Sequence, residues 1–231
     1  MHQVLTPIRS LETLADLVER LGGIPLERIR FHPPPGTATE QDVLEALEAP
    51  RKRICELVDG TLVEKTMGIR ESVLAGIILQ QLWNFLDVYD LGIASAPDGT
   101  LKFKIGLVRI PDVSFISWER IPNQEMPEDP IPAIIPDLAI EVISKGNTRQ
   151  EMDRKLREYF KAGVRLAWLI YPNSLTAEVY TSPRKIQIIK KDGVLDGGEI
   201  LPGFSLTLKS LFERATRRRT NGHGKRKKNQ P

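Results

Sequence analysis

The pattern of apolar and polar residues changes character near residue 54. Before that point, apolar residues recur at helical spacing in 11–21 and again in 43–47. After it, 54–58 and 61–64 read as strands that flank Asp59-Gly60, a pair suited to the positive φ angles of a two-residue turn. The pattern therefore predicts two short helices followed by a β-hairpin.

The longest amphipathic segment, 70–91, predicts a helix that buries one face. The residues expected on that face are Val73, Leu74, Ile77, Ile78, Leu82, Phe85 and Leu86. Two almost wholly apolar runs, 138–143 and 165–171, are typical of buried central strands, and a helix capped by Asn147 separates them. Further short strands are expected around 93–96, 101–105, 112–118, 176–180, 185–190 and after Gly203. This order predicts an α/β fold with a mixed β-sheet core flanked by helices and a β-hairpin before the first core helix.

Two acidic residues stand where the strands are otherwise apolar. Asp112 opens the strand that follows Pro111, and Glu141 interrupts the apolar run 138–143. A carboxylate in a buried strand costs several kcal/mol unless a cation or hydrogen bonds compensate for it. One reading is a Mg²⁺ site, because two converging carboxylates provide the oxygen ligands that this ion prefers. The alternative is structural, with Asp112 capping a turn and Glu141 paired with an arginine.

Lys155 is a third candidate for the site. It flanks the apolar face of the helix after Glu141, so its ammonium group could reach the polar edge of the sheet. The alternative is a lysine whose stem covers apolar surface while its charge stays in water. Lys145 is the nearer lysine in sequence, but Gly146 and the helix cap after it indicate that the strand has already ended there.

Composition narrows the class of protein. The 231 residues are 41% apolar, which is enough for a core and too many for a disordered chain. No run approaches the roughly 20 apolar residues of a membrane span, and the first residues lack a signal-peptide pattern. The single cysteine, Cys55, excludes an intramolecular disulfide and a multi-cysteine zinc site. We therefore expect a cytoplasmic protein without a membrane partner.

The positive charge of the chain is concentrated at its end. The segment 214–231 holds eight Lys or Arg and no acid, whereas the rest of the chain has 25 basic residues against 30 acidic ones, a formal charge of −5. A basic end on an acidic body is common in proteins that bind nucleic acid, but it also suits a solubilising disordered tail. The candidate nucleic-acid-binding residues are Arg217, Arg218, Arg219, Lys225, Arg226, Lys227 and Lys228.

Several blocks of the sequence, taken together in their order and spacing, are similar to a known family. They are Glu56–Glu64, Pro111–Val113, Pro136–Leu138 with Glu141–Ser144, Lys155 with Tyr159, Gly163 and Trp168–Pro172, and Leu201–Phe204 with Leu211-Phe212. They resemble the Uma-two-type restriction endonuclease family, whose fold is that of the PD-(D/E)xK nucleases. The resemblance spans roughly 39–213, which leaves 1–38 as an N-terminal helical appendage and 214–231 as a basic disordered tail.

The resemblance implies a role for individual residues. Asp112 matches the acid of the "PD" element and Glu141 the acid of the "(D/E)xK" element, and the carbonyl of Val142 is implied as a further metal ligand. Ile143 stands where the superfamily lysine should be, and Lys155 matches the position from which such families supply it. Glu56 matches an early family glutamate and is a further catalytic candidate. Glu71 falls near a position where the family often has histidine.

The expected function is therefore endonucleolytic hydrolysis of phosphodiester bonds, with DNA as the substrate and Mg²⁺, or Mn²⁺ in its place, as the metal. A homodimer would fit double-strand cleavage. The alternative is a catalytically inactive protein of the same fold that binds nucleic acid, which the residue at Ile143 and the missing histidine would favour. A protein-interaction module is a third class, and it predicts no affinity for nucleic acid.

Overall fold

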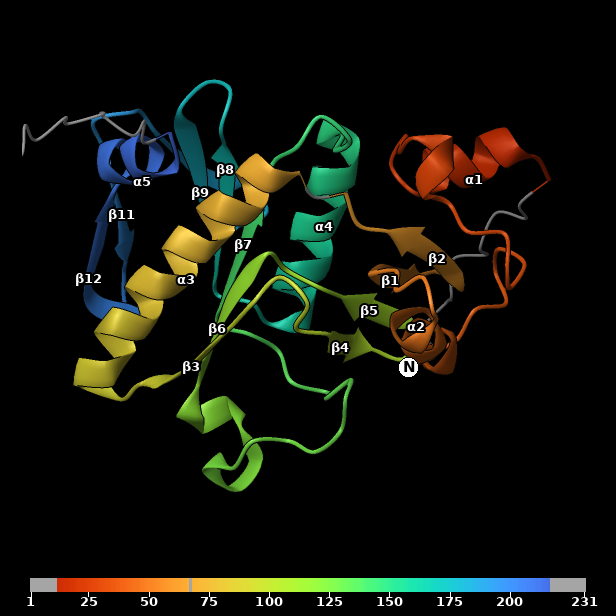
Figure 1. Cartoon of the computed structure of the whole chain (residues 1–231), viewed down its shortest axis with the longest axis horizontal. Helices are drawn as coiled ribbons and strands as arrows, with labels where there is room; N and C mark the ends of the chain where they lie inside the picture. The colour runs from red at the N-terminus through yellow and green to blue at the C-terminus, as the bar shows by residue number, and fades with distance from the viewer. Residues whose placement is uncertain (1–11, 67, 217–231) are drawn as a thin grey trace, which may run out of the picture.

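The computed structural model describes residues 12–66 and 68–216, whose strands form two main sheets and a separate hairpin (Figure 1). The six-stranded sheet has the order β10-β9-β8-β7-β6-β3, and only the central pair β7 and β8 is parallel. Its strands are β3 (Gly92–Ser95), β6 (Val113–Ser117), β7 (Leu138–Val142), β8 (Leu166–Tyr171), β9 (Thr176–Ser182) and β10 (Lys185–Ile189). The predicted mixed α/β sheet with two buried central strands is confirmed.

The four-stranded sheet has the order β2-β1-β5-β4. Its strands are β1 (Cys55–Val58), β2 (Thr61–Glu64), β4 (Leu101–Lys104) and β5 (Leu107–Arg109). Asp59 and Gly60, with φ of 48° and 68°, form the expected turn between β1 and β2. β5 was not predicted, because a strand of three residues has too few positions to show alternation. β4 was predicted as part of one mixed sheet but belongs to this second sheet.

Helices cover both faces of the six-stranded sheet. Helix α3 (Ile69–Tyr89) packs on one face together with α5 (Leu208–Ala215), and α4 (Arg149–Ala162) packs on the other. Alternate residues of β8 show the two faces, since Trp168 contacts the α3 side and Leu169 the α4 side. The expected buried face of α3 is wrong at Val73, which is 39% exposed.

The start of α4 also differs from the prediction. Thr148 caps the helix and accepts a hydrogen bond from the backbone N–H of Glu151 at 3.0 Å. Asn147 instead accepts hydrogen bonds from the backbone N–H and the hydroxyl of Ser144, both at 2.9 Å. Either residue can cap a helix, and the tight turn after β7 occupies the side chain of Asn147.

The residues before the hairpin pack onto the rest of the fold. They form α1 (Leu14–Arg20), the 3₁₀ turn η1 (Leu26–Arg28) and α2 (Glu40–Glu48). Leu17, Leu21 and Ile29 share a buried cluster with Tyr159 of α4 and with the β1–β2 hairpin. Gly22, with a φ of +92°, lies so near α4 that a Cβ atom there would come within 2.7 Å of the backbone of Glu151.

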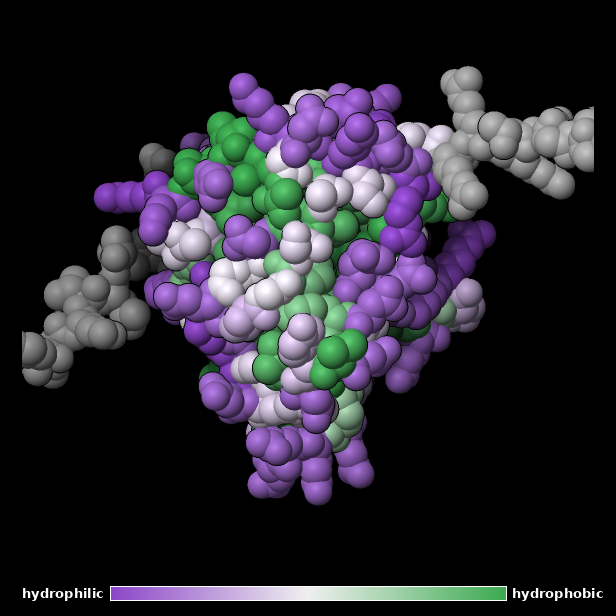
Figure 2. All heavy atoms as spheres, turned by 90° about the vertical axis from the view of Figure 1, so that its left-hand side faces the viewer, coloured by the Kyte–Doolittle hydropathy of each residue, from purple (hydrophilic) through white to green (hydrophobic). Residues whose placement is uncertain are grey.

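The last strands, β11 (Val194–Gly197) and β12 (Leu201–Thr207), form a hairpin beside α5. The strand expected after Gly203 is β12, whereas β11 was not predicted. Seen from the left-hand side of Figure 1, hydrophobic residues reach the surface in a broken band among hydrophilic ones (Figure 2). Two further 3₁₀ turns, η2 (Trp118–Arg120) and η3 (Pro122–Gln124), follow β6. In the described part of the chain, no helix is long and apolar enough to cross a membrane.

Candidate active site

Five charged residues from different elements meet between the two main sheets. Glu56 comes from β1, Arg109 ends β5, Asp112 immediately precedes β6, Glu141 lies on β7 and Lys155 lies on α4. Their exposed fractions are 1% to 5%, so the site is closed off from bulk water. The expected convergence of the two acids and Lys155 is thus present in the structure.

Backbone periodicity aims Glu141 at α4. Ile140 and Val142 belong to the cluster on the α3 side, so Glu141, which lies between them on the strand, points to the opposite face. Lys155 projects from α4 onto that face. Its ammonium group lies 2.9 Å from Oε1 of Glu141 and 3.0 Å from Oε1 of Glu56, and the hydroxyl of Tyr159 donates a hydrogen bond to the same oxygen of Glu141.

Asp112 is fixed by contacts on both of its oxygens. Oδ2 accepts a hydrogen bond from the backbone N–H of Val142 at 2.7 Å, which places Asp112 directly beside Glu141 on the next strand. Oδ1 lies 2.8 Å from Nζ of Lys65, which also donates to the carbonyl of Ile110. Lys65 follows the last residue of β2, and its side chain is 6% exposed.

Glu56 has a full set of hydrogen-bond donors. Its Oε2 accepts from Nη1 of Arg109 at 2.7 Å, and Oε1 accepts from the backbone N–H of Ile110 at 3.1 Å in addition to Lys155. Arg109 also pairs with Glu158 of α4. Glu56 therefore orients the lysine and the arginine, and any metal at its oxygens would have to displace one of these donors.

Lys155 and Glu56 hold each other in the charged state. Burial alone would raise the pKa of Glu56, but Lys155 and Arg109 hold it well below its usual range. Burial alone would lower the pKa of Lys155, but Glu141 and Glu56 raise it above its usual range. Lys155 is therefore an ammonium group at neutral pH in this arrangement.

The pKa of Glu141 shifts in the opposite direction to that of Glu56. Burial raises it and Asp112 adds to the effect, although Lys155 opposes both. Burial and the charge of Glu141 also raise the pKa of the phenol of Tyr159, which stays a hydrogen-bond donor. A carboxylate whose charged form is disfavoured by burial and by a neighbouring acid is a place where a bound cation is stabilising.

The donor set fits a hard divalent cation. Asp112 and Glu141 offer carboxylate oxygens on adjacent strands, and Oε2 of Glu141 accepts no hydrogen bond from any described residue. Within 12–66 and 68–216, no three or more His, Cys, Asp or Glu side chains are grouped to hold a metal ion. A cation here would therefore rely on the two carboxylates and the expected carbonyl of Val142, with water or phosphate oxygens completing its shell, as Mg²⁺ commonly does.

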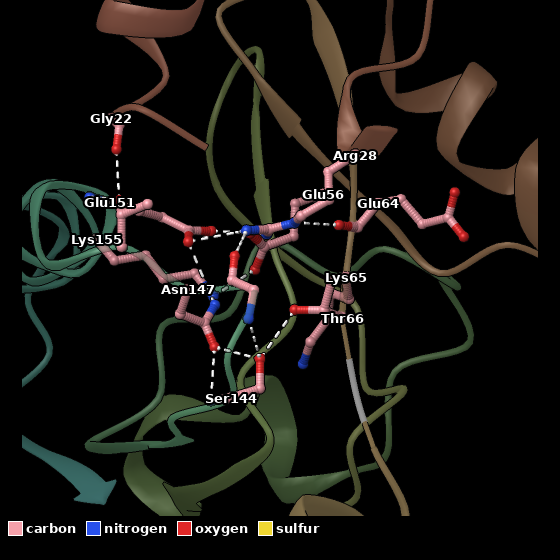
Figure 3. A network of polar contacts seen from close by, with 12 residues as sticks. Gly22, Arg28, Glu56, Glu64, Lys65, Thr66, Ser144, Asn147, Glu151 and Lys155 are labelled. Carbon is pink, nitrogen blue, oxygen red and sulfur yellow. Dashed lines mark hydrogen bonds and ion pairs between the residues drawn. The ribbon is translucent and has the colours of Figure 1, made fainter. Parts of the chain in front are cut away.

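The buried contacts of one lysine, Lys65, and one arginine, Arg28, were not predicted from the sequence. Nothing in the sequence singles out Lys65, because no spacing distinguishes it from other lysines. Arg28 lay in the segment expected to be an appendage, yet its guanidinium is buried and binds both carboxylate oxygens of Glu151, at 2.7 and 2.9 Å. Figure 3 shows Arg28 between Glu151 of α4 and Glu64 at the end of β2, with dashed lines to both.

Other candidates lie away from this cluster. Lys145 is exposed in the turn after β7, and Glu71 lies in the first turn of α3; neither contacts the two candidate metal ligands in the described structure. The basic residues Arg217–Arg219 and Lys225–Lys228 lie outside the described residues, so their role in binding nucleic acid stays a prediction.

Comparisons with known proteins agree with the architecture. The model of the family Uma2, described as a putative restriction endonuclease, matches residues 41–209, which is more than half of the chain. No curated protein matches. Among solved structures, a putative nuclease belonging to DUF820 from Anabaena variabilis superposes with a TM-score of 0.65 at 22% identity. The match covers 75% of this chain and 98% of that one, and at this identity it supports the fold alone.

Proposed function

The chain belongs to the Uma2 family of putative restriction endonucleases, and we propose that it hydrolyses phosphodiester bonds in DNA with Mg²⁺ as its metal. The observation that carries this proposal is the meeting of Asp112, Glu141 and Lys155 in one buried cluster, although they come from three separate elements. Two identical sites in a homodimer would serve the two strands of a duplex.

The two carboxylates would hold the cation, together with the carbonyl of Val142. When bound there, Mg²⁺ would polarise the scissile phosphate and lower the pKa of a water molecule. Asp112 would offer the metal a fixed oxygen, because the N–H of Val142 anchors its other oxygen at 2.7 Å. Glu141 would offer Oε2, since Oε1 is engaged by Lys155 and Tyr159.

Lys155 acts through its charge. An ammonium group with a raised pKa is a poor base, so Lys155 orients the attacking water and offsets the negative charge that develops on the phosphate. Glu56 and Tyr159 are positioning residues. Glu56 fixes the ammonium group at 3.0 Å, and Tyr159 fixes the carboxylate that the ammonium group contacts.

A cleavage assay tests this function. The purified full chain is incubated with supercoiled plasmid in Mg²⁺, in Mn²⁺ and in chelator, together with Asp112→Ala, Glu141→Ala and a control, Asp153→Ala, whose carboxylate is on the surface of α4. We expect nicked or linear product only with a divalent cation, no product from the first two variants and a normal rate from the control. Cleavage at the wild-type rate by a folded Asp112→Ala or Glu141→Ala variant would show that the assignment is wrong.

A second candidate function is nucleic-acid binding without cleavage. It is favoured by the pairing of both candidate ligands with lysines, Asp112 with Lys65 and Glu141 with Lys155, which neutralises the two acids without a metal. That protein would shift plasmid in a gel in the presence of chelator and leave it intact in Mg²⁺ and Mn²⁺.

A further inference from the structure

The buried cluster around the two candidate ligands is balanced in charge. Five carboxylates pair in it with five cations: Glu56, Asp112, Glu141, Glu151 and Glu158 with Arg28, Lys65, Arg109, Arg154 and Lys155. A divalent cation that entered this arrangement unchanged would leave two positive charges uncompensated in a place with little water. Uncompensated buried charge costs several kcal/mol per ion.

Lys65 is the member of the cluster that can leave most easily. Lys155 and Arg109 each bridge two carboxylates, and Arg28 holds one carboxylate and two carbonyls through four hydrogen bonds. Lys65 pairs with Asp112 alone and otherwise donates to the carbonyl of Ile110. Lys65 is also the one cation that pairs with Asp112 in the described structure. The oxygen that it contacts, Oδ1, is the one that the backbone N–H of Val142 leaves available for a metal.

The residue Lys65 has open space beside it. It lines a hollow of about 410 Å³ that Lys52, Arg53 and Ser72 also line, although its side chain is turned to Asp112 and only 6% exposed. Of the two acids on the hollow, Glu64 is already paired with Arg53 and with Arg30, and Asp98 is the other. Three basic residues and a hydroxyl thus line a hollow that adjoins Lys65, the partner of Asp112, and such a set of donors suits a phosphodiester group.

We propose that Lys65 is the internal counter-cation of Asp112, which gives way when a divalent cation binds and then pairs with a backbone phosphate of the nucleic acid in this hollow. The inference rests on the proposed function. The charges balance if two phosphates take part: the metal adds two positive charges, the departure of Lys65 from Asp112 removes one, and the scissile phosphate at the metal removes the other, while a neighbouring backbone phosphate neutralises Lys65 in the hollow. Metal and nucleic acid therefore bind cooperatively, and the metal alone binds weakly because it must displace an ammonium group.

The test measures metal affinity without any cleavage. Mn²⁺ binding to the full chain is titrated by calorimetry in the absence of nucleic acid, for the wild type, Lys65→Gln and Lys65→Met. Gln keeps a donor for the carbonyl of Ile110 while it removes the charge, so it guards against a folding defect in the Met variant. Lys145→Gln, which removes an exposed charge next to β7, is the matched control.

We expect Lys65→Gln and Lys65→Met to bind Mn²⁺ at least about tenfold more tightly than the wild type, which corresponds to about 1.4 kcal/mol, and Lys145→Gln to match the wild type. A duplex with phosphorothioate linkages, added at constant ionic strength, should raise the Mn²⁺ affinity of the wild type by a similar factor and that of Lys65→Gln by less. Equal or weaker Mn²⁺ binding by Lys65→Gln would overturn the inference.

The two proposals fail in different ways. If the wild type binds Mn²⁺ and cuts plasmid but Lys65→Gln binds no more tightly, the role of Lys65 is wrong and the metal-dependent nuclease stands. If neither protein binds Mn²⁺ and plasmid stays intact, the metal-dependent function is wrong and the role of Lys65 is overturned with it.

Discussion

Replacement of Arg28 by methionine should destabilise the fold strongly, although Arg28 lies outside the part of the chain that matches the family. Its guanidinium binds both oxygens of Glu151, and it also donates to the backbone carbonyls of Glu64 at 2.9 Å and Gly146 at 2.8 Å. It therefore joins the end of β2, the turn after β7 and the first turn of α4 (Figure 3). Both side chains of the ion pair are 5% exposed.

The expected magnitude follows from this burial. Removal of one partner of a buried ion pair leaves the other charge uncompensated and costs about 3–5 kcal/mol. For a chain of this size, about 2–4 °C of melting temperature is lost per kcal/mol, so Arg28→Met should melt lower by about 6–20 °C. Glu151→Met should cost a similar amount, because it leaves the guanidinium unpaired. In Arg28→Met/Glu151→Met, no charge is left unpaired: the two carbonyls lose their donor and the side-chain amide of Asn147 loses its acceptor. The double variant should therefore lose much less than the sum of the single losses.

Urea unfolding followed by tryptophan fluorescence and circular dichroism measures these differences. Arg149→Met is the matched control, since Arg149 is 55% exposed in its ion pairs and such pairs are worth about 0–1 kcal/mol. The reasoning would be refuted if Arg28→Met lost less than about 1 kcal/mol, or if the losses of the two single variants simply added in the double variant.

Four other outcomes are expected. In single-turnover cleavage at saturating DNA and Mg²⁺, Lys155→Ala should cut at least about a hundredfold more slowly than the wild type, whereas Lys145→Ala should cut at close to the wild-type rate. If Lys145→Ala is the slow variant instead, the catalytic lysine is Lys145. Burial raises the pKa of the Cys55 thiol to about 11, so a thiol reagent should modify the native protein at pH 8 only as fast as it unfolds, and rapid labelling would contradict the burial. Burial disfavours the charged form of Glu151, but Arg28 holds the pKa of its carboxyl below 4.5. The ion pair therefore contributes its full stability above pH 4.5 and loses it as the pH falls further. In urea titrations at acid pH, Glu151→Met/Arg28→Met should show a shallower loss of the free energy of unfolding than the wild type. Removal of 217–231 takes away seven basic residues and should flatten the salt dependence of DNA binding, by roughly 0.9 in the log–log slope for each phosphate that these residues neutralise, while cleavage persists; an unchanged slope would reduce this segment to a solubility device.

Features that depend on neighbours in the chain could be read from the sequence. Asp59-Gly60 specifies the hairpin turn because the two residues themselves adopt positive φ angles. The apolar runs that became β7 and β8 identify the buried centre of the sheet because a strand covered on both faces has no polar side. Asp112 and Glu141 could be identified as site candidates for the same reason, since a carboxylate in such a strand needs a compensating partner.

The identity of those partners was decided by the tertiary structure. Lys65 reaches Asp112 across 47 residues of sequence, and Arg28 reaches Glu151 across 123. No local pattern records such contacts, because a lysine or arginine that will be buried has the same sequence neighbourhood as one that stays in water. The division of the strands into two sheets likewise follows from the pairing of β5 with β1, which lies far earlier in the chain. The sequence by itself determined which elements form and where unpaired charge would be costly, and only the packing of distant elements determined which cations neutralise that charge.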